Sequence, residues 1–391
     1  MKRPCPSCRS PEAQPLFAQR FARIEGGSIH GGYDVACCRL CGTLYADGIP
    51  SQPEFDRYYQ AMSKYESPSA AGTTSPIDQR RFAEIAALVA PHLPAGARVL
   101  EIGCASGGLL AELVGRGVAR AAGIDPSPAC ARTARELYGL DVRAGSVFDD
   151  PFAGETFDAL VLVGVLEHLV DVGRAFELLR RKLAPDGLVF FEVPDASRFA
   201  EFAEVPFQQL SVEHVNFFTP ASLASLAGHH GFEVVASAQP VRDTGRRGLE
   251  PVVAMLLRRT EQAVASTADE SGRDALARYL EASERLEAPH RKVVEALAAQ
   301  ARPVVVWSAG TQALRLVATS ALGRVPIAAF IDGNPRYDGK SINGRPIVGP
   351  SQLARFSEPV LVASSGFQRE IVEAIRGQWR RQNELVLLDA A

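Results

Sequence analysis

The sequence predicts an α/β protein with two separate parallel-sheet units and a small cysteine-rich unit in front of them. Short apolar segments alternate with helical patterns twice along the 391 residues, first over residues 98–193 and again over residues 304–388. The strands of a parallel sheet are covered by helices on both faces, so they appear in a sequence as short apolar runs between helices of this length. Five of the seven cysteines lie within the first 41 residues, which sets the N-terminal segment apart.

The composition is that of a globular protein of two or three domains. Hydrophobic residues make up 47% of the chain, and 42 lysines and arginines nearly balance 45 acidic residues, for a net charge of −3. This balance lacks the basic footprint of a dedicated nucleic-acid-binding protein. The first twenty residues contain no apolar signal-peptide core, and no uncharged apolar run reaches the length of a membrane span. We therefore expect a cytoplasmic protein, monomeric or homodimeric, that binds neither nucleic acid nor a membrane.

The same patterns divide the chain into three predicted domains. Residues 1–66 are polar and turn-rich and contain the cysteine cluster. Residues 67–241 begin with a linker of small residues and continue with five predicted strands, at residues 98–103, 121–125, 142–145, 159–164 and 188–193. Residues 242–391 contain a charge-rich helical region and then the second strand–helix alternation.

Four of the N-terminal cysteines form two pairs with metal-ligand spacing. Cys5 and Cys8 make one CxxC turn, and Cys38 and Cys41 make a second one after a gap of 29 residues. Two such turns complete a closed four-thiolate site, which favours structural Zn²⁺ over catalytic zinc because no coordination position stays open. Reduced free cysteines and a redox-active CxxC pair are the alternatives. Cys37 is expected to point away from the site.

A glycine-rich turn follows the first predicted strand of the middle domain. Residues 101–108 read EIGCASGG and lie between an apolar strand and a helix, where glycines let a ligand approach the backbone and the helix N-terminus. Asp125 ends the next strand, 24 residues after Glu101, in the position of a carboxylate that binds ribose hydroxyls. The ExGxxxG pattern fits S-adenosylmethionine (SAM) better than a dinucleotide, because SAM has no pyrophosphate. An ordinary strand–turn–helix corner with a chance acid is the alternative.

The predicted SAM site extends over the ends of the neighbouring strands. Ser146-Val147 follows the third strand, and Leu166-Glu167-His168 follows the fourth. The residues predicted to bind the cofactor are Glu101, Gly103, Cys104, Ala105, Gly107, Asp125, Pro126, Ser146, Val147 and Gly164.

In this order the motifs resemble the class I SAM-dependent methyltransferases that carry an N-terminal four-cysteine zinc-binding domain and a C-terminal Rossmann-like domain, the sugar C-methyltransferase family. The resemblance spans nearly the whole chain. It rests on CPSC with CRLCG, on VLEIGCASGGLL and GIDPS, on SVEHVNFFTP and on IDGNPRYDGKSINGRPIVGP. It implies a Rossmann-like SAM methyltransferase core and transfer of a methyl group to a carbon next to a carbonyl, in a nucleotide-linked deoxy-keto-sugar.

The resemblance also points to catalytic residues. His214, preceded by Glu213, matches a Glu-His pair whose histidine is the proposed general base, and His168 matches a histidine near the substrate. C-methylation needs a base, and imidazole exchanges a proton readily near neutral pH. Glu213 would orient the ring, and His168, Tyr65 or a backbone amide would donate to the developing enolate. The alternative for His214 is that it caps the helix beginning near Pro220 or is hydrogen-bonded within a loop.

The role of the C-terminal domain stays open. Residues 308–311, SAGT, follow a strand and open a helix, so their amides can bind a phosphate, and Asp332 ends the following strand. By resemblance this domain helps hold the nucleotide of the substrate or closes over the active site, and a packing role is the alternative. Two other functions are considered: O- or N-methylation of another small metabolite in polysaccharide or natural-product biosynthesis, and a zinc-ribbon RNA-binding or RNA-modifying protein.

Overall fold

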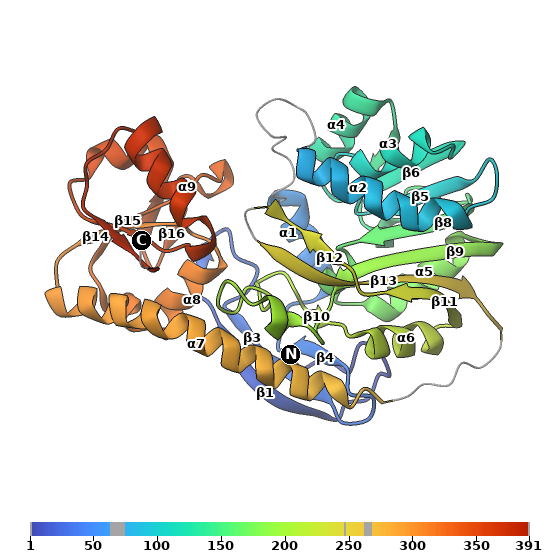
Figure 1. The fold of residues 1–391 in the computed structure, drawn as a ribbon, viewed down its shortest axis with the longest axis horizontal. Helices are drawn as coiled ribbons and strands as arrows, with labels where there is room; N and C mark the ends of the chain where they lie inside the picture. Colours follow the sequence, from blue (N-terminus) through green and yellow to red (C-terminus); the bar gives the residue numbers. More distant parts are fainter. Residues whose placement is uncertain (1, 63–74, 246–247, 262–267, 390–391) are drawn as a thin grey trace.

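The structure is a computed structural model that describes residues 2–62, 75–245, 248–261 and 268–389. Its strands form three sheets. In Figure 1 the two α/β units stand beside each other, the N-terminal sheet lies at the base, and the long helix α7 passes under the C-terminal unit toward that sheet. No helix within the described ranges combines the length and the apolar character needed to cross a membrane.

The largest sheet forms the middle unit and has the order β11-β13-β9-β8-β5-β6-β7. Its central strands are parallel, and β13 runs antiparallel to both of its neighbours. The strands are β5 (Arg98–Ile102), β6 (Arg120–Asp125), β7 (Asp141–Ala144), β8 (Phe157–Val163), β9 (Leu183–Pro194), β11 (Phe232–Ala238), β12 (Val241–Asp243) and β13 (Leu249–Arg259). The five predicted strands are confirmed as β5 to β9.

Helices cover both faces of this sheet. One face packs on α2 (Pro76–Val89), α3 (Gly108–Gly115) and α4 (Pro128–Tyr138), and the other packs on α5 (Val172–Lys182) and α6 (Pro220–His229). Successive strand residues alternate between the two cores: Phe190 belongs to the first and Phe191 to the second. Both faces are therefore apolar, which explains the uninterrupted apolar runs in the sequence.

The predicted boundary after residue 241 differs from the observed sheet. β13 lies beyond that boundary, yet it pairs with β9 and β11 in the interior of the middle unit. The middle unit therefore extends to residue 259. β13 follows β9 only after β10, α6, β11 and β12, and its antiparallel return has no βαβ signature, so local sequence patterns do not mark it as part of this sheet.

The N-terminal sheet is completed by a strand from the middle unit. Its order is β1-β3-β4-β10, and its strands are β1 (Ala13–Arg20), β3 (Gly32–Cys38), β4 (Leu44–Asp47) and β10 (Asn216–Phe217). The helix α1 (Gln52–Met62) follows the first three. The predicted domain of residues 1–66 is therefore not a self-contained sheet, because β10 comes from a segment about 150 residues further along the chain.

The C-terminal sheet has the order β19-β18-β14-β15-β17-β16-β2, with five parallel strands from β19 to β17. Its strands are β14 (Val304–Trp307), β15 (Ile327–Ile331), β16 (Ser341–Ile342), β17 (Arg345–Val348), β18 (Val360–Val362), β19 (Leu385–Leu387) and the N-terminal β2 (Ile24–Glu25). The accompanying helices are α7 (Ser271–Gln300), α8 (Thr311–Thr319) and α9 (Gln368–Glu373).

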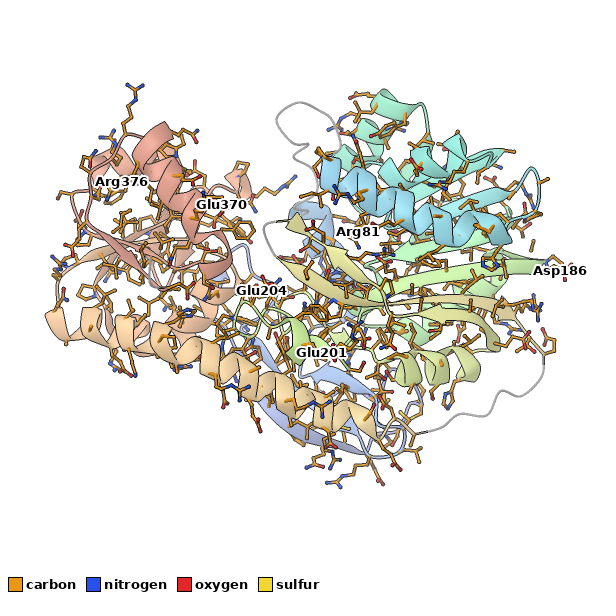
Figure 2. All side chains as sticks on the ribbon, in the orientation of Figure 1. Arg81, Asp186, Glu201, Glu204, Glu370 and Arg376 are labelled. Atoms are coloured by element: carbon orange, nitrogen blue, oxygen red, sulfur yellow. The ribbon has the colours of Figure 1, made fainter. Side chains whose placement is uncertain are left out.

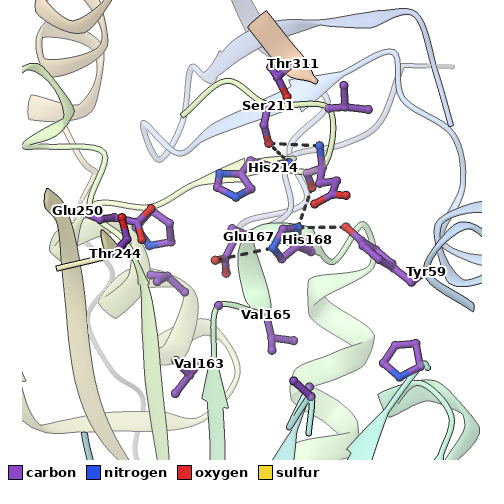
Figure 3. Close-up of a pocket in the computed structure, with 18 of the residues that line it drawn as sticks. Tyr59, Val163, Val165, Glu167, His168, Ser211, His214, Thr244, Glu250 and Thr311 are labelled. Carbon is purple, nitrogen blue, oxygen red and sulfur yellow. Dashed lines mark hydrogen bonds and ion pairs between the residues drawn. The ribbon is translucent and has the colours of Figure 1, made fainter. Parts of the chain in front are cut away.

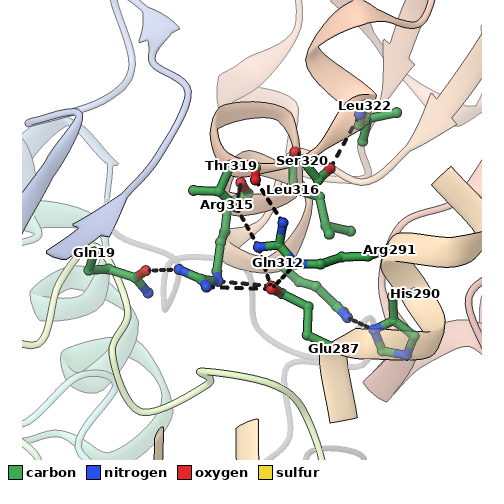
Figure 4. Close-up of polar contacts among 10 residues, drawn as sticks. All are labelled: Gln19, Glu287, His290, Arg291, Gln312, Arg315, Leu316, Thr319, Ser320 and Leu322. Atoms are coloured by element: carbon green, nitrogen blue, oxygen red, sulfur yellow. Dashed lines mark hydrogen bonds and ion pairs between the residues drawn. The ribbon is translucent and has the colours of Figure 1, made fainter. Parts of the chain in front are cut away.

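A buried arginine, paired with a glutamate of the C-terminal unit, contacts the N-terminal unit as well (Figure 4). Nε of Arg315, on α8, donates to Glu287 of α7 at 2.8 Å, and its guanidinium also contacts the Gln19 side chain of β1. The same guanidinium stacks 3.6 Å from the ring centroid of Phe207. Gln19 in turn donates to the carbonyl oxygen of Leu210 at 2.8 Å. Residues 207–210 are thereby fixed against both units.

Replacing Glu287 with alanine should lower the free energy of unfolding by about 3 kcal/mol, because a buried arginine loses its carboxylate. Urea denaturation measures this loss. Glu281→Ala is the matched control on the same helix: its pair with Arg285 is exposed and 3.9 Å long, so its removal should change stability by no more than about 0.5 kcal/mol. Equal losses in the two variants would contradict a structural role for the Arg315–Glu287 pair.

Candidate functional site

A cavity of about 930 Å³ lies where the three units meet. The carboxyl ends of β5, β6, β7 and β8 contribute to it from one side, and residues 308–312 and 364–367, after β14 and β18, contribute from the other. Tyr58 and Tyr59 of α1 also line it. Ligands of open α/β sheets bind outside the carboxyl ends of the strands, so the cavity lies where both sheets would place a ligand.

The glycine loop after β5 forms one half of the cavity. Asp125 holds the loop: its carboxylate accepts the amide of Ala105 through Oδ2 and the amide of Ser127 through Oδ1, both at 2.9 Å. Glu101 is buried, and its Oε2 has no hydrogen-bond partner among the described residues. Burial, followed by the nearby charge of Asp125, raises the pKa of Glu101 to about 8. A ligand rich in hydroxyl groups would satisfy this orphaned oxygen.

Nine of the ten residues predicted to bind the cofactor line this cavity. They are Glu101, Gly103, Cys104, Ala105, Asp125, Pro126, Ser146, Val147 and Gly164. Gly107 does not line it. It precedes α3 with a φ of +81°, and a Cβ there would lie 2.8 Å from Cδ1 of Leu140. The structure therefore requires glycine at this position for the turn and for packing.

His168 and His214 form the other half of the cavity (Figure 3). Their ring centroids lie 4.9 Å apart, edge to face. Nδ1 of His168 lies 3.0 Å from the carbonyl oxygen of Glu213 and 3.0 Å from the hydroxyl of Tyr59. A carbonyl oxygen can only accept, so the bond to Glu213 places a proton on Nδ1. Nε2 of the same ring lies 4.0 Å from Oε1 of Glu167.

The loop that carries His214 is held at several points. The amides of Glu213 and His214 donate to Oγ of Ser211 at 3.3 and 3.2 Å. The amide of Val215 donates to the carbonyl oxygen of Glu167 at 2.7 Å. His214 does not cap the following helix, because the side chain of Thr219 caps α6. The capping alternative for His214 is therefore wrong.

Glu213 makes two contacts at the histidine pair. Its carbonyl oxygen contacts His168, and its carboxylate accepts a hydrogen bond of 3.2 Å from Tyr58. Tyr65, the aromatic residue expected near the substrate, lies outside the described residues, as does most of the predicted linker. The described aromatic residues at the histidine pair are Tyr58 and Tyr59, in the helix-like stretch FDRYYQAM.

Glu167 brings a carboxyl group to the histidine pair, within 4.8 Å of a ring nitrogen of each histidine. Its residue is 3% exposed, and Oε2 has no hydrogen-bond partner in the described part of the chain. Burial, followed by the charge of Glu250, raises the pKa of Glu167 to about 8. At neutral pH this side chain is therefore mainly a neutral carboxylic acid.

A buried charge network closes the wall of the cavity behind these residues. Arg242 pairs with Glu192 at 2.6 Å and with Glu84 at 2.7 Å, and Arg81 of α2 pairs with Glu192 at 3.3 Å. Figure 2 shows Arg81 between α2 and the strands of the sheet. Arg81 is the only lysine or arginine among the described residues that line the cavity. Arg81, Glu192 and Arg242 are far apart in the sequence, so no short sequence motif predicts these ion pairs.

The four predicted zinc ligands converge at a second site. The Sγ atoms of Cys5 and Cys41 lie 3.6 Å apart, those of Cys8 and Cys38 lie 3.5 Å apart, and all four fall within 4.8 Å of one another. A tetrahedral zinc site with Zn–S bonds of about 2.3 Å has sulfur–sulfur separations of about 3.8 Å. The thiol of Cys37 is directed at the carbonyl oxygen of Gly42, outside this group.

Residues 77–237 match the family model described as a methyltransferase domain. A ubiquinone biosynthesis O-methyltransferase of Azorhizobium caulinodans is 31% identical over 161 residues, which span 38% of this chain and 63% of that protein. The O-methyltransferase cnsE of Penicillium expansum is 27% identical over 178 residues, spanning 42% of this chain and 64% of that protein. The chain thus covers less than two thirds of the length of these relatives.

Among solved structures, a similar chain is the 1,6-didemethyltoxoflavin-N1-methyltransferase of Burkholderia thailandensis, determined with S-adenosylhomocysteine. It is 21% identical, the match covers 57% of this chain and 97% of that chain, and the TM-score is 0.42. The middle unit therefore contains a region that matches a methyltransferase domain, built on an open α/β sheet whose central strands are parallel.

Proposed function

We propose that the protein transfers a methyl group from SAM to a carbon next to a carbonyl in a small acceptor, with His214 as the general base. The observation that carries this proposal is the meeting of two halves in one cavity: the glycine loop with Glu101 and Asp125, and the pair His168–His214.

The first half fits SAM in its chemistry. Asp125 is fixed by two backbone amides, and Glu101 offers an unpartnered carboxyl oxygen to a hydroxyl of the ligand. When bound, SAM supplies an electrophilic methyl group on a sulfonium.

The second half supplies the proton acceptor. His214 takes the proton from the carbon next to the carbonyl, and the loop bonds through Ser211 and Val215 keep its backbone in place. His168 stands edge to face against the same ring and is oriented by Glu213 and Tyr59. A positioned general base typically accelerates such a proton transfer about 10²- to 10⁴-fold.

The acceptor class we propose is a nucleotide-linked deoxy-keto-sugar. The loop of residues 308–312 lines the cavity opposite the SAM half, and Asp332 braces it by accepting the amide of Ala309 at 2.7 Å. With Arg81 already paired to Glu192, a diphosphate would be bound by the backbone amides of the first turn of α8.

A second candidate function is O-methylation of a small molecule. It is favoured by the relatives, since two that match the middle unit are named O-methyltransferases. The same base would then take a proton from a hydroxyl group.

The cysteine cluster is proposed to hold one structural zinc ion. Four thiolates leave no open position for catalysis, so the ion would act on folding. Arg3, two residues before Cys5, donates to the carbonyl oxygens of Val170 and Val215. A zinc ion that orders the cysteine cluster would therefore also hold Arg3 in place against the loop that carries His214.

Asp125→Asn should weaken SAM binding by about tenfold or more. The amide would direct a donor at one of the two backbone amides that the carboxylate accepts, and hydrogen bonds to a charged group contribute about 1.5–3 kcal/mol. Isothermal titration calorimetry measures the affinity. Asp141→Asn, at an exposed position on β7, is the control and should bind SAM normally. Unchanged affinity in Asp125→Asn would remove the loop from the SAM site.

His214→Asn should reduce kcat by about 10²- to 10⁴-fold and leave SAM affinity unchanged. The assay uses SAM with a ¹³C-labelled methyl group and a panel of nucleotide-linked 4-keto-deoxy-sugars, and product NMR identifies the atom that carries the label. A carbon-linked methyl supports the proposal. An oxygen-linked methyl would favour the second candidate function, and full activity of His214→Asn would exclude His214 as the base.

Cys38→Ser should lose the bound zinc and lower the melting temperature, since a structural zinc site contributes directly to folding. Inductively coupled plasma mass spectrometry counts the metal, with one zinc per chain expected in the unmodified protein. Cys37→Ser is the matched control at the neighbouring cysteine and should keep its zinc. Equal zinc content in both variants would contradict the four-cysteine site.

A further inference from the structure

We propose that Glu167 is a further catalytic residue, which as a neutral carboxylic acid donates a hydrogen bond to the carbonyl oxygen of the acceptor while His214 removes the neighbouring proton. This inference rests on the function proposed above and identifies the group that stabilises the developing enolate.

The position of Glu167 is the first argument. A Cβ built at Gly164, in the cofactor half, would lie 3.5 Å from Oε1 of Glu167. The same oxygen lies 4.0 Å from Nε2 of His168, in the acceptor half. One side-chain atom each of Glu167, His168 and His214 lies within 4.8 Å of the other two. The carboxyl group therefore stands where the two halves of the cavity join (Figure 3).

The orphaned oxygen is the second argument. Oε2 of Glu167 is buried and makes no hydrogen bond within the described residues, and its residue lines the cavity. A buried polar atom without a partner costs about 1–3 kcal/mol. A carbonyl oxygen in the acceptor would give the acid proton its partner, so binding of the acceptor removes this penalty.

The surrounding charges favour the acid form. Burial is the main cause, and Glu250 on β13 and Glu192 on β9 add negative potential. Arg81 of α2 acts in the opposite direction, but it is paired with Glu192. His168, His214 and Glu213, with the phenols of Tyr58 and Tyr59, are further titratable groups among the described residues on this side of the cavity. A carboxylic acid kept neutral in an apolar site is a known means of stabilising an enolate.

The reaction balances with Glu167 as a donor that keeps its proton. The proton on the carbon passes to the imidazole of His214, and its electron pair spreads onto the carbonyl oxygen, which draws the hydrogen bond from Glu167 closer. The carbon then forms a bond to the methyl group as the sulfur–methyl bond breaks, and the carbonyl double bond is restored. His214 ends with the extra proton, which it releases to water.

Two substitutions separate a donor from a charged group at this position. Glu167→Gln keeps a donor but has no negative charge to offer, so kcat at pH 7 should stay within about tenfold of the unmodified enzyme. Glu167→Ala removes the donor and should lose about 10²- to 10³-fold, as removal of one oxyanion donor does elsewhere. Glu136→Gln, exposed on α4, controls for loss of one charge and should change nothing.

The pH dependence gives the second readout. The pKa of Glu167 is raised to about 8, so the acid is present below that pH and is lost above it. The kcat of the unmodified enzyme should therefore fall as the pH rises through about 8, and Glu167→Gln should lack this decline. If Glu167→Gln were as inactive as Glu167→Ala, or if activity required an added divalent cation, Glu167 would act as a charged carboxylate. Either result would overturn the proposal.

An infrared measurement decides the protonation state without turnover. The difference spectrum between the unmodified protein and Glu167→Gln, both with S-adenosylhomocysteine at pH 7, should contain the carbonyl stretch of a carboxylic acid. An active enzyme without this band would overturn the role of Glu167 alone. Absence of methyl transfer to every acceptor, with SAM bound, would overturn the proposed function and the role of Glu167 with it.

Discussion

Backbone pairing between β4 and β10 fastens the N-terminal sheet to the segment that carries His214. Asn216 pairs with Tyr45 and Phe217 with Leu44, and the side chain of Asn216 donates to the carbonyl oxygens of Leu166 and Leu169. One short strand thus joins the N-terminal sheet to the turn after β8. The positions of both histidines depend on these contacts. Asn216 and Val215, which follow His214, are hydrogen-bonded to the backbone of the turn that contains His168.

The cavity follows from how the two larger units face each other. Their parallel sheets direct strand carboxyl ends at one shared space, and the N-terminal unit fills the angle between them with α1. A continuous apolar core, which includes Tyr33, Phe207, Tyr279 and Phe330, runs through all three units. The Arg315–Glu287 pair lies within this region. Separating the units would expose this apolar core to water. The buried apolar surface therefore holds the two halves of the site in fixed relative positions.

Carboxyl groups dominate the electrostatics of the cavity. Glu101 and Glu167 are both buried with one unpartnered oxygen, and burial raises the pKa of each to about 8. A buried carboxyl oxygen without a hydrogen-bond partner destabilises the fold until a ligand forms that bond. Binding sites commonly sacrifice some stability for function in this way. A third buried carboxylate, Glu192, has its charge neutralised by ion pairs with Arg242 and Arg81, so its burial destabilises the fold less.

The sequence alone determined the α/β class, the five central strands, the glycine loop with Asp125, and the two CxxC turns, because each of these is encoded by local periodicity or by short fixed spacing. The tertiary structure decided what depends on contacts between distant segments: that β13 lies between β9 and β11 inside the middle sheet, that Gly107 serves packing, and that Tyr59 and Glu167 meet the histidine pair. Burial and partnership of a side chain are properties of the folded chain, so no spacing rule reveals them.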